Sequence, residues 1–423
     1  MLDPDERAAV QKRVLRVLTA GQVVGAAALA AAVTVGAFVV QTILGHNTPW
    51  AGIATATVTL GTAFMSQVLS QVMGRKGRRP GLQLGYLLAA GGGLLSAIGA
   101  ERSQLPVFLV GLFLLGSGQA SNLLARYAAA DLAAADERSR AMSRILFAST
   151  FGAVLGPLVI APAQHAGQAL GFGLYTGPWI FSALFFLGAA MNTALRLRPD
   201  PLLVAGGLTT GEPNPPEGPT ARRALIIIVN SGPALLALTA MVLSQVTMVA
   251  VMAMTPVHLK LHGHEAVSAY VISTHIAGMY AFSPLVGRFS DKRGRVPTIF
   301  IGSGLLFVAS VLAAVSGDVE QLLFPALWLL GIGWSFALIG GSTLLVESVR
   351  PHDRVGVQGT ADLLMSFCGG LAGLSSGFIR SAFGFHVLAQ FAALAALVLF
   401  AVTFFARLSR PVLFGSGIPS RRA

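Results

Sequence analysis

Long apolar stretches recur along the whole sequence, and they limit the possible folds more than any other feature. A helix of about 20 apolar residues crosses the hydrocarbon core of a bilayer, which is about 30 Å thick. Twelve such stretches lie at 17–43, 50–73, 81–99, 106–130, 143–162, 176–197, 233–257, 266–287, 297–315, 322–346, 357–380 and 386–407. Charged residues make up only 11% of the 423 residues, too few to cover the surface of a soluble protein. The sequence therefore predicts an all-α membrane protein with twelve transmembrane helices.

The positive charge is concentrated in alternate loops. With both chain termini in the cytoplasm, 26 of the 29 Lys and Arg residues lie in or beside cytoplasmic segments. The other three are Arg102, Lys260 and Arg380. Because Lys and Arg remain on the cytoplasmic side, we expect a multi-pass protein of the plasma (inner) membrane in this orientation. The net charge of +12 is then a topology signal, and we expect no nucleic-acid partner.

The two halves of the chain repeat one another. Residues 198–222 are rich in Pro and Gly and separate the first six apolar stretches from the last six. The basic loops at 74–79 and 287–295 correspond at a shift of 217 residues, and Asp131 and Glu347 correspond at a shift of 216. Parallel six-helix repeats are a known transporter plan. We expect a six-helix bundle over 1–197, a cytoplasmic linker over 198–222 and a second bundle over 223–423.

Residues 287–295, with the sequence GRFSDKRGR, carry the most specific motif of the chain. They resemble the loop motif G-x-x-x-D-R-x-G-R of the major facilitator superfamily. The first copy departs from this pattern, since Ser70 and Gly74 stand at the places of its Gly and Asp, while Gly77, Arg78 and Arg79 match. The resemblance covers the whole chain. It implies two pseudo-symmetric bundles that rock about a central site in a monomer that uses no cofactor.

A second resemblance lies in the fifth apolar stretch. Gly152-x-x-x-Gly156-Pro157 is similar to the antiporter motif of drug:proton exporters, although the glycine pair that ends that motif is missing. Small residues and a proline also suit close helix packing and a bend. The resemblance implies proton-coupled export of lipophilic or amphipathic small molecules by alternating access.

Asp291 is the acid of the second basic loop. A carboxylate can accept backbone N–H groups at a helix start and can pair with arginine. By the repeat, we expect the neighbour of Asp291 to be the start of the fifth helix, near Arg144. This contact would close the cytoplasmic face and break when that face opens. The other gating candidates on this loop are Gly287, Gly294 and Arg295. The alternative is a solvated turn that only sets the topology.

The first basic loop has no acid, because Gly74 occupies the place of Asp291. A closing contact there would need Arg75 or Arg78 against an acid of the other half, such as Asp353 or Asp362.

His275 is the first candidate for proton coupling. It lies near the middle of its apolar stretch, about 15 Å from either end of the helix. Ionisable groups at such depth are costly, and histidine titrates near neutral pH. The alternative is a neutral imidazole that hydrogen-bonds two helices. Asp362 is the second candidate, although Asp362 and Arg126 would also suit structural ion pairs with loop charges.

Polar side chains in the first, fourth, seventh and tenth stretches are candidates for a substrate cavity, because these helices line the central cavity in the resembled family. They are Gln22, Gln119, Asn122, Arg126, Gln245, Trp334 and Ser335. The spacing of the three polar residues in the fourth stretch places them on one helix face. Hydrogen bonding between helices is the alternative role.

The sequence also excludes some functions. It contains no G-x-x-x-x-G-K-[ST] segment for ATP and no nucleophile–base–acid set, so we expect neither an ATP-driven pump nor an enzyme. His258 and His262 have HxxxH spacing at the outer end of the seventh stretch, but we expect no metal site. The alternatives are a proton-coupled importer of a small nutrient, a metal or siderophore exporter, and a non-transporting membrane receptor or scaffold.

Overall fold

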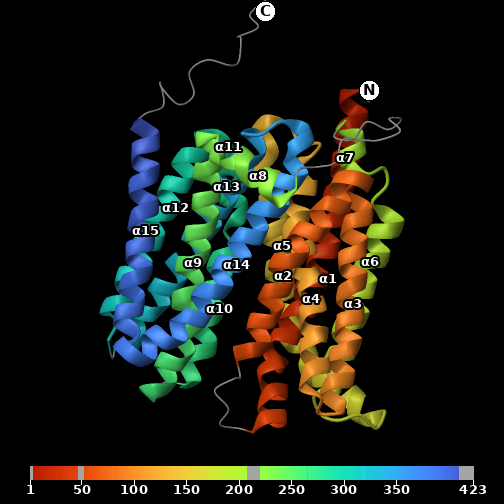
Figure 1. The fold of residues 1–423 in the computed structure, drawn as a ribbon, viewed down its shortest axis with the longest axis vertical. Helices are drawn as coiled ribbons and strands as arrows, with labels where there is room; N and C mark the ends of the chain where they lie inside the picture. Colours follow the sequence, from red (N-terminus) through yellow and green to blue (C-terminus); the bar gives the residue numbers. More distant parts are fainter. Residues whose placement is uncertain (1–2, 46–51, 207–219, 264, 318, 409–423) are drawn as a thin grey trace, which may run out of the picture.

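The computed structural model describes residues 3–45, 52–206, 220–263, 265–317 and 319–408. Long helices dominate these ranges (Figure 1). In the first half they are α1 (Pro4–Leu44), α2 (Ile53–Lys76), α3 (Arg78–Glu101), α4 (Leu105–Ala130), α5 (Arg138–Ala169) and α6 (Thr176–Arg196). In the second half they are α9 (Gly232–Leu261), α10 (Glu265–Tyr280), α11 (Ser283–Arg293), α12 (Arg295–Val315), α13 (Leu323–Glu347), α14 (Arg354–Phe383) and α15 (Phe385–Leu408).

Short elements connect these helices. They are α7 (Pro201–Val204), α8 (Ala221–Val229) and the 3-10 turns Ala135–Glu137, Glu320–Leu322 and Pro351–Asp353. Residues 207–219 of the expected linker lie outside the described residues, while α7 and the start of α8 lie on either side of them.

The expected all-α membrane fold is confirmed, with one difference in the eighth stretch. Within the described ranges, eleven helices are long and apolar enough to cross a membrane. The stretch predicted at 266–287 is instead divided into α10 and α11 by a turn at Ala281–Phe282. Pro284 accounts for the break, because proline lacks a backbone N–H and is tolerated in the first turn of a helix but not in its interior, and here it lies in the first turn of α11.

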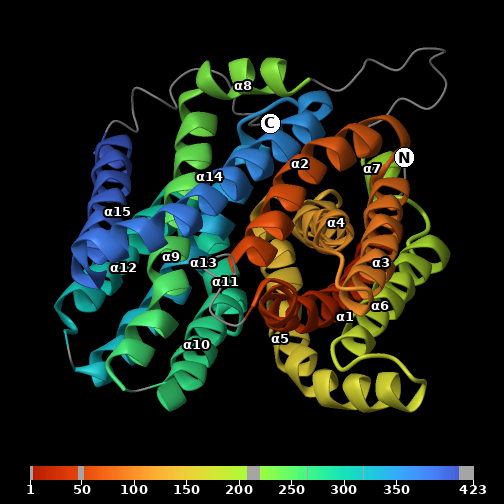
Figure 2. The same ribbon diagram turned by 60° about the horizontal axis from the view of Figure 1, so that its bottom comes forward.

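Each half has its own apolar core. One cluster of buried side chains consists mainly of residues from Val14 to Leu202 among α1 to α6, joined by Val346 and Val355 of the second half. The other consists mainly of residues from Ala224 to Leu399 among α9 to α15, joined by Leu146 of the first half. Figure 2 shows the two groups of helices side by side. Within each half, apolar side chains of these helices pack against one another. The helical hydrogen bonds satisfy the backbone groups that face lipid.

The main contacts between the halves lie along two helix pairs, α2 with α14 and α5 with α11, and smaller ones join α5 to α10 and α13 and α4 to α14. Figure 2 shows α2 beside α14. Both basic loops, α7 and α8 lie at one end of the bundle, which is the upper end in Figure 1. We call this end the basic face.

Candidate functional site

On the basic face, Asp291 of α11 holds the start of α5. Its carboxylate accepts hydrogen bonds from the backbone N–H groups of Ser139 and Arg140 at 3.1 and 2.9 Å. The first turn of α5 has no side-chain cap of its own, so a carboxylate of the other half satisfies it. Arg295 donates to the same carboxylate at 2.9 Å. Asp291 therefore contacts the start of the fifth helix as expected, but at Ser139 and Arg140, one turn before Arg144, which is exposed.

Arg295 links the second loop to both halves. Its guanidinium donates to Glu347 at 2.9 Å and to the carbonyl oxygen of Ala135, in the other half, at 2.7 Å. Gly294 precedes it with a φ of 95°, which favours glycine. A Cβ at Gly287 would overlap the Ser143 hydroxyl, so glycine permits the close approach of α11 to α5.

Arg78 occupies the corresponding place in the first half. It is fully buried, and it donates to Asp131 at 2.8 and 3.1 Å and to the Gln358 side-chain oxygen at 2.8 Å. The acid partner of Arg78 therefore belongs to its own half, and its partner in the other half is an amide, which corrects the expectation of Asp353 or Asp362 for Arg78. Burial raises the pKa of Asp131, and the Arg78 guanidinium opposes this rise.

The α2–α14 contact repeats the α5–α11 contact with one acid missing. A Cβ at Gly359 would overlap the Ser70 hydroxyl, just as Gly287 faces Ser143. Gly74 lies beside the start of α14, where an added Cβ would be 3.9 Å from Val355. Gly74 is thus the counterpart of Asp291, and it offers no carboxylate to the first turn of α14.

Deeper in the molecule, Arg126 of α4 and Asp362 of α14 pair across the halves. The Nη2 atom of Arg126 is 2.5 Å from Oδ1 of Asp362, and their side chains are 1% and 0% exposed. Arg126 also donates to Ser342 of α13 at 3.1 Å and to the Tyr127 hydroxyl at 3.1 Å. These two residues therefore pair with each other and not with loop charges. Oδ2 of Asp362 has no hydrogen-bond partner among the described residues.

The other predicted cavity residues make contacts within one half. Gln22 donates to Ser149 at 2.9 Å, and Asn122 accepts from the Tyr86 hydroxyl at 3.1 Å. In the second half, Trp334 donates its indole N–H to Gln245 at 2.7 Å. The Ser335 hydroxyl is buried without a hydrogen-bond partner in the described ranges, and Gln119 is half-buried. Of the predicted cavity set, Arg126 is the residue for which the structure gives hydrogen bonds across the halves.

His275 lies inside the second half. Its side chain is fully buried on α10, and its Nδ1 is 2.8 Å from the Leu327 carbonyl oxygen on α13. The other ring nitrogen has no hydrogen-bond partner among the described residues. This geometry corresponds to the alternative role, an imidazole that bonds two helices.

The glycines of the fifth stretch pack α5 against α1. A Cβ at Gly152 would meet Ala26 and the carbonyl oxygen of Val23. Gly156 is buried, whereas Pro157 is exposed on the outer surface. At the far end of α9, the rings of His258 and His262 lie with centroids 4.2 Å apart and are tilted by 50°. The described residues contain no group of three potential metal ligands.

Sequence reasoning missed Tyr127 and Gln358 of the contact between the halves, and it did not predict that Ser342 contacts Arg126. The repeat offered one signal, because Ser342 is 216 residues after Arg126 and so occupies the same place in its half. No comparable signal pointed to Gln358.

Two related helical halves, joined by a buried ion pair and by two loop contacts, are the architecture of a membrane transporter. The sequence pattern described as Major Facilitator Superfamily matches residues 18–274 and 236–419. The chain belongs to this superfamily.

Individual relatives agree with this assignment. The chain is 35% identical over 407 residues to the uncharacterized MFS-type transporter YdeG of Bacillus subtilis, covering 96% of this chain and 94% of YdeG. It is 27% identical to the riboflavin transporter RfnT of Brucella anthropi, covering 85% of this chain and 86% of RfnT. The fold is similar to that of the human organic anion transporter MFSD10, with a TM-score of 0.69, 17% identity and coverage of 93% and 99%.

Proposed function

We propose that this transporter couples the entry of protons to the export of lipophilic or amphipathic small molecules by alternating access. The observation that carries the proposal is the buried pair of Arg126 and Asp362 across the two halves. Ionisable groups inside a membrane protein are costly, and they mark ion and substrate pathways.

Protonation of Asp362 is the coupling step in this proposal. Substrate and proton compete for the unpartnered oxygen of Asp362. A polar group of the substrate binds this oxygen while the carboxylate is ionised and paired with Arg126. A proton from the outside removes the negative charge and releases the substrate, and the proton leaves to the cytoplasm before the next substrate molecule binds. Asp362 is preferred to His275 because it joins the two halves, whereas His275 bonds two helices of one half.

Asp291 supplies the gate in this proposal. When the basic face lies on the cytoplasmic side of the plasma membrane, the contacts of Asp291 with the start of α5 hold that face closed. Rocking of the halves breaks these contacts, together with the bond from Arg78 to Gln358. The proposed direction of transport is export, because the segment from Gly152 to Pro157 is similar to the antiporter motif of drug:proton exporters.

Import of a small nutrient is the second candidate, favoured by the similarity to the riboflavin transporter RfnT. Purified protein in liposomes with an imposed pH gradient separates the two. If the protein is an exporter, ethidium or another lipophilic dye should move in the direction opposite to the protons. Import predicts that riboflavin moves in the same direction as protons.

The Asp362→Asn variant tests the coupling site. We expect it to lose proton-driven flux and to lose the release of protons on substrate binding. The matched control is Asp136→Asn, because Asp136 is exposed in the loop before α5. Unchanged proton-driven flux in Asp362→Asn would refute this assignment, and the same loss in His275→Ala alone would transfer it to His275. Absence of flux for every dye and for riboflavin would favour a receptor or scaffold.

A further inference from the structure

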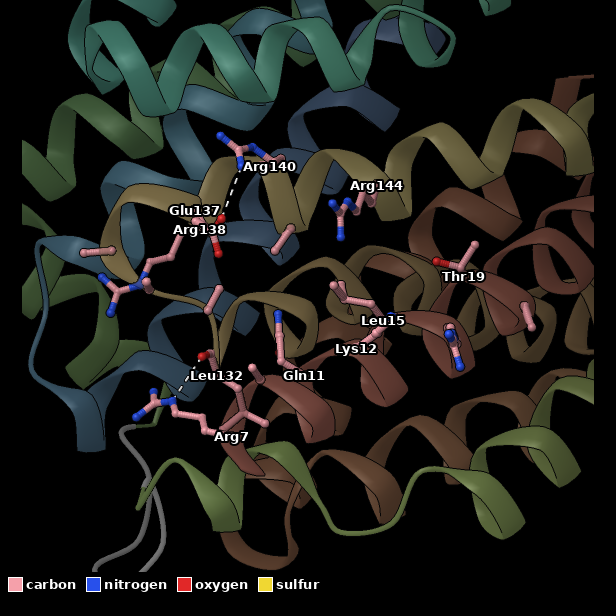
Figure 3. Close-up of a pocket in the computed structure, with 17 residues that line it drawn as sticks. Arg7, Gln11, Lys12, Leu15, Thr19, Leu132, Glu137, Arg138, Arg140 and Arg144 are labelled. Carbon is pink, nitrogen blue, oxygen red and sulfur yellow. Dashed lines mark hydrogen bonds and ion pairs between the residues drawn. The ribbon is translucent and has the colours of Figure 1, made fainter. Parts of the chain in front are cut away.

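A cavity of about 1130 Å³ opens on the basic face between the start of α1, the loop after α4 and the start of α5 (Figure 3). All of its lining residues belong to the first half of the chain, between Arg7 and Arg144. Its lining cations are Arg7, Lys12, Arg16, Arg138, Arg140 and Arg144. The single acid among the lining residues is Glu137. We call this cavity the basic pocket.

Neighbouring acids leave most of this positive charge unbalanced. Glu137 takes Arg140 at 3.2 Å, and Arg138 is 3.8 Å from Glu347. In the described part of the chain, no carboxylate lies within ion-pair distance of the other four lining cations. The Nε atoms of Arg138 and Arg140 are buried without hydrogen-bond partners among these residues. The pocket therefore has the charge of an anion site.

Two helices present the cations to the same space. Lys12 and Arg16 are four residues apart on α1, and Arg140 and Arg144 are four residues apart on α5, so each pair shares a helix face. Figure 3 shows Lys12 and Arg144 on the two helices that border the cavity. The backbone amides that begin α5 are already bonded to Asp291, so an anion here would be bound by side chains.

The pocket also lies at the boundary between polar and apolar sequence. After Arg16 the rest of α1 has no charged residue, and after Arg144 the rest of α5 has no Asp, Glu, Lys or Arg. Small and apolar side chains such as Leu15 and Ala141 complete the wall. Basic pockets between membrane helices suit phosphate head groups, with each Lys or Arg near an anionic surface strengthening binding about fivefold.

We propose that the basic pocket is a binding site for a phosphate group, carried by an anionic phospholipid or by a soluble phosphate compound. The site lies wholly in the first half and shares no residue with the Arg126–Asp362 pair. Two of its lining residues, Arg140 and Ala135, also contact Asp291 and Arg295 through their backbone groups. Binding to the pocket is measured without transport, so its test is separate from that of the proposed transport reaction.

Binding to the purified full-length chain in an uncharged maltoside detergent tests this proposal. The probes are dioctanoyl-phosphatidylglycerol, dioctanoyl-phosphatidylcholine and inorganic phosphate, each titrated by thermophoresis. We expect saturable binding of phosphatidylglycerol and at least tenfold weaker binding of the zwitterionic lipid. The Arg16→Gln/Arg144→Gln variant should bind phosphatidylglycerol about 25-fold more weakly, at about fivefold per cation. The matched control is Arg13→Gln, which removes an exposed cation of α1 outside the pocket lining.

The outcomes distinguish the two sources. Tight binding of phosphatidylglycerol alone supports a lipid site, and equal binding of inorganic phosphate supports a soluble phosphate compound. Equal binding of phosphatidylcholine, or the same loss in Arg13→Gln as in the double variant, would overturn the proposal and leave the cations as topology signals. Thermal unfolding of each variant checks that it remains folded.

Discussion

At the residue scale, the guanidinium of Arg126 has partners on three helices. It donates to Ser342 on α13, to Asp362 on α14, and to the Leu123 carbonyl oxygen on its own helix. Removing two ions from water costs free energy that their attraction only partly offsets, so such a pair contributes little net stability. Breaking it from one side is a different matter, because the remaining charge is then buried alone.

This difference gives the first prediction. The Arg126→Leu variant should lower the free energy of unfolding by about 3–5 kcal/mol, because Asp362 would be buried without its partner. The Arg126→Leu/Asp362→Leu variant should regain most of that stability without regaining transport. Thermal unfolding in detergent and flux in liposomes measure the two effects. Additive losses in the double variant would contradict this account.

At the scale of elements, α5 and α14 begin in different ways although they are counterparts. Asp291 of the other half satisfies the first turn of α5. The N-cap of α14, Asp353, makes no side-chain hydrogen bond to that helix, and Gly74 is the residue that faces its start. A carboxylate at a helix start contributes about 0.3–1 kcal/mol, so the two closures differ in strength.

The second prediction concerns the stronger closure. Asp291→Asn should raise the population that is open at the basic face about fivefold, since about 1 kcal/mol of charge–helix interaction is lost. Spin labels at Lys76 and Arg350, which are exposed on opposite halves, report the separation. The exposed charge removed in Arg288→Gln is the control. A distance distribution equal to the parent's would show that Asp291 is not a gate.

The third prediction builds the missing closure. Gly74→Asp should lower the open population about threefold to fivefold, because the new carboxylate would reach the first turn of α14. An added Cβ fits there, with Val355 3.9 Å away. Gly74→Asn is the control without charge, and it should have a smaller effect. The same spin-label pair measures both variants, and a shift toward the open state would disprove the correspondence with Asp291.

The fourth prediction tests the close helix contact. Gly359→Ala should favour the open state, because its methyl group would overlap Ser70 when α2 and α14 are together. Ser70→Gly in the same chain should restore part of the closed population. If the second substitution restores nothing, the overlap is not what separates the helices.

At the scale of the whole molecule, all the hydrogen bonds that the structure gives between the halves lie in the part of the bundle nearer the basic face. They extend from the Arg126–Asp362 pair outward to Asp291 and Arg295. The described conformation is therefore sealed at the basic face. The positive charges of the loops predict that this face lies on the cytoplasmic side.

The fifth prediction tests that orientation. In a chain with Cys368→Ser, Arg102→Cys should react with an impermeant maleimide in intact cells, whereas Lys76→Cys should react only after permeabilisation. Both positions are exposed. Lys76 ends α2 at the basic face, and Arg102 follows the end of α3 at the opposite end of the bundle. The reverse pattern would place the basic face outside.

The sequence alone could predict the helices, since apolar length determines what can span a bilayer and backbone groups in lipid must bond internally. It did not predict the break in the eighth stretch, because the side chains on both sides of Pro284 are mainly apolar and form one stretch long enough to span a bilayer. The repeat of the two halves predicted that Asp291 lies at the start of α5. The pairing of Arg126 with Asp362 was out of reach, because these residues are 236 positions apart and only the packing of the two halves brings them together.

Arg126 and Ser342 are the same position of the repeat, and they touch at 3.1 Å. In a pair of identical halves related by a two-fold axis, a residue on that axis meets its own copy. Two guanidinium groups would then face each other in apolar surroundings, where like charges repel strongly. One arginine is as much as this place accommodates, so a duplicated ancestor could acquire its central cation only after its two copies had become unequal.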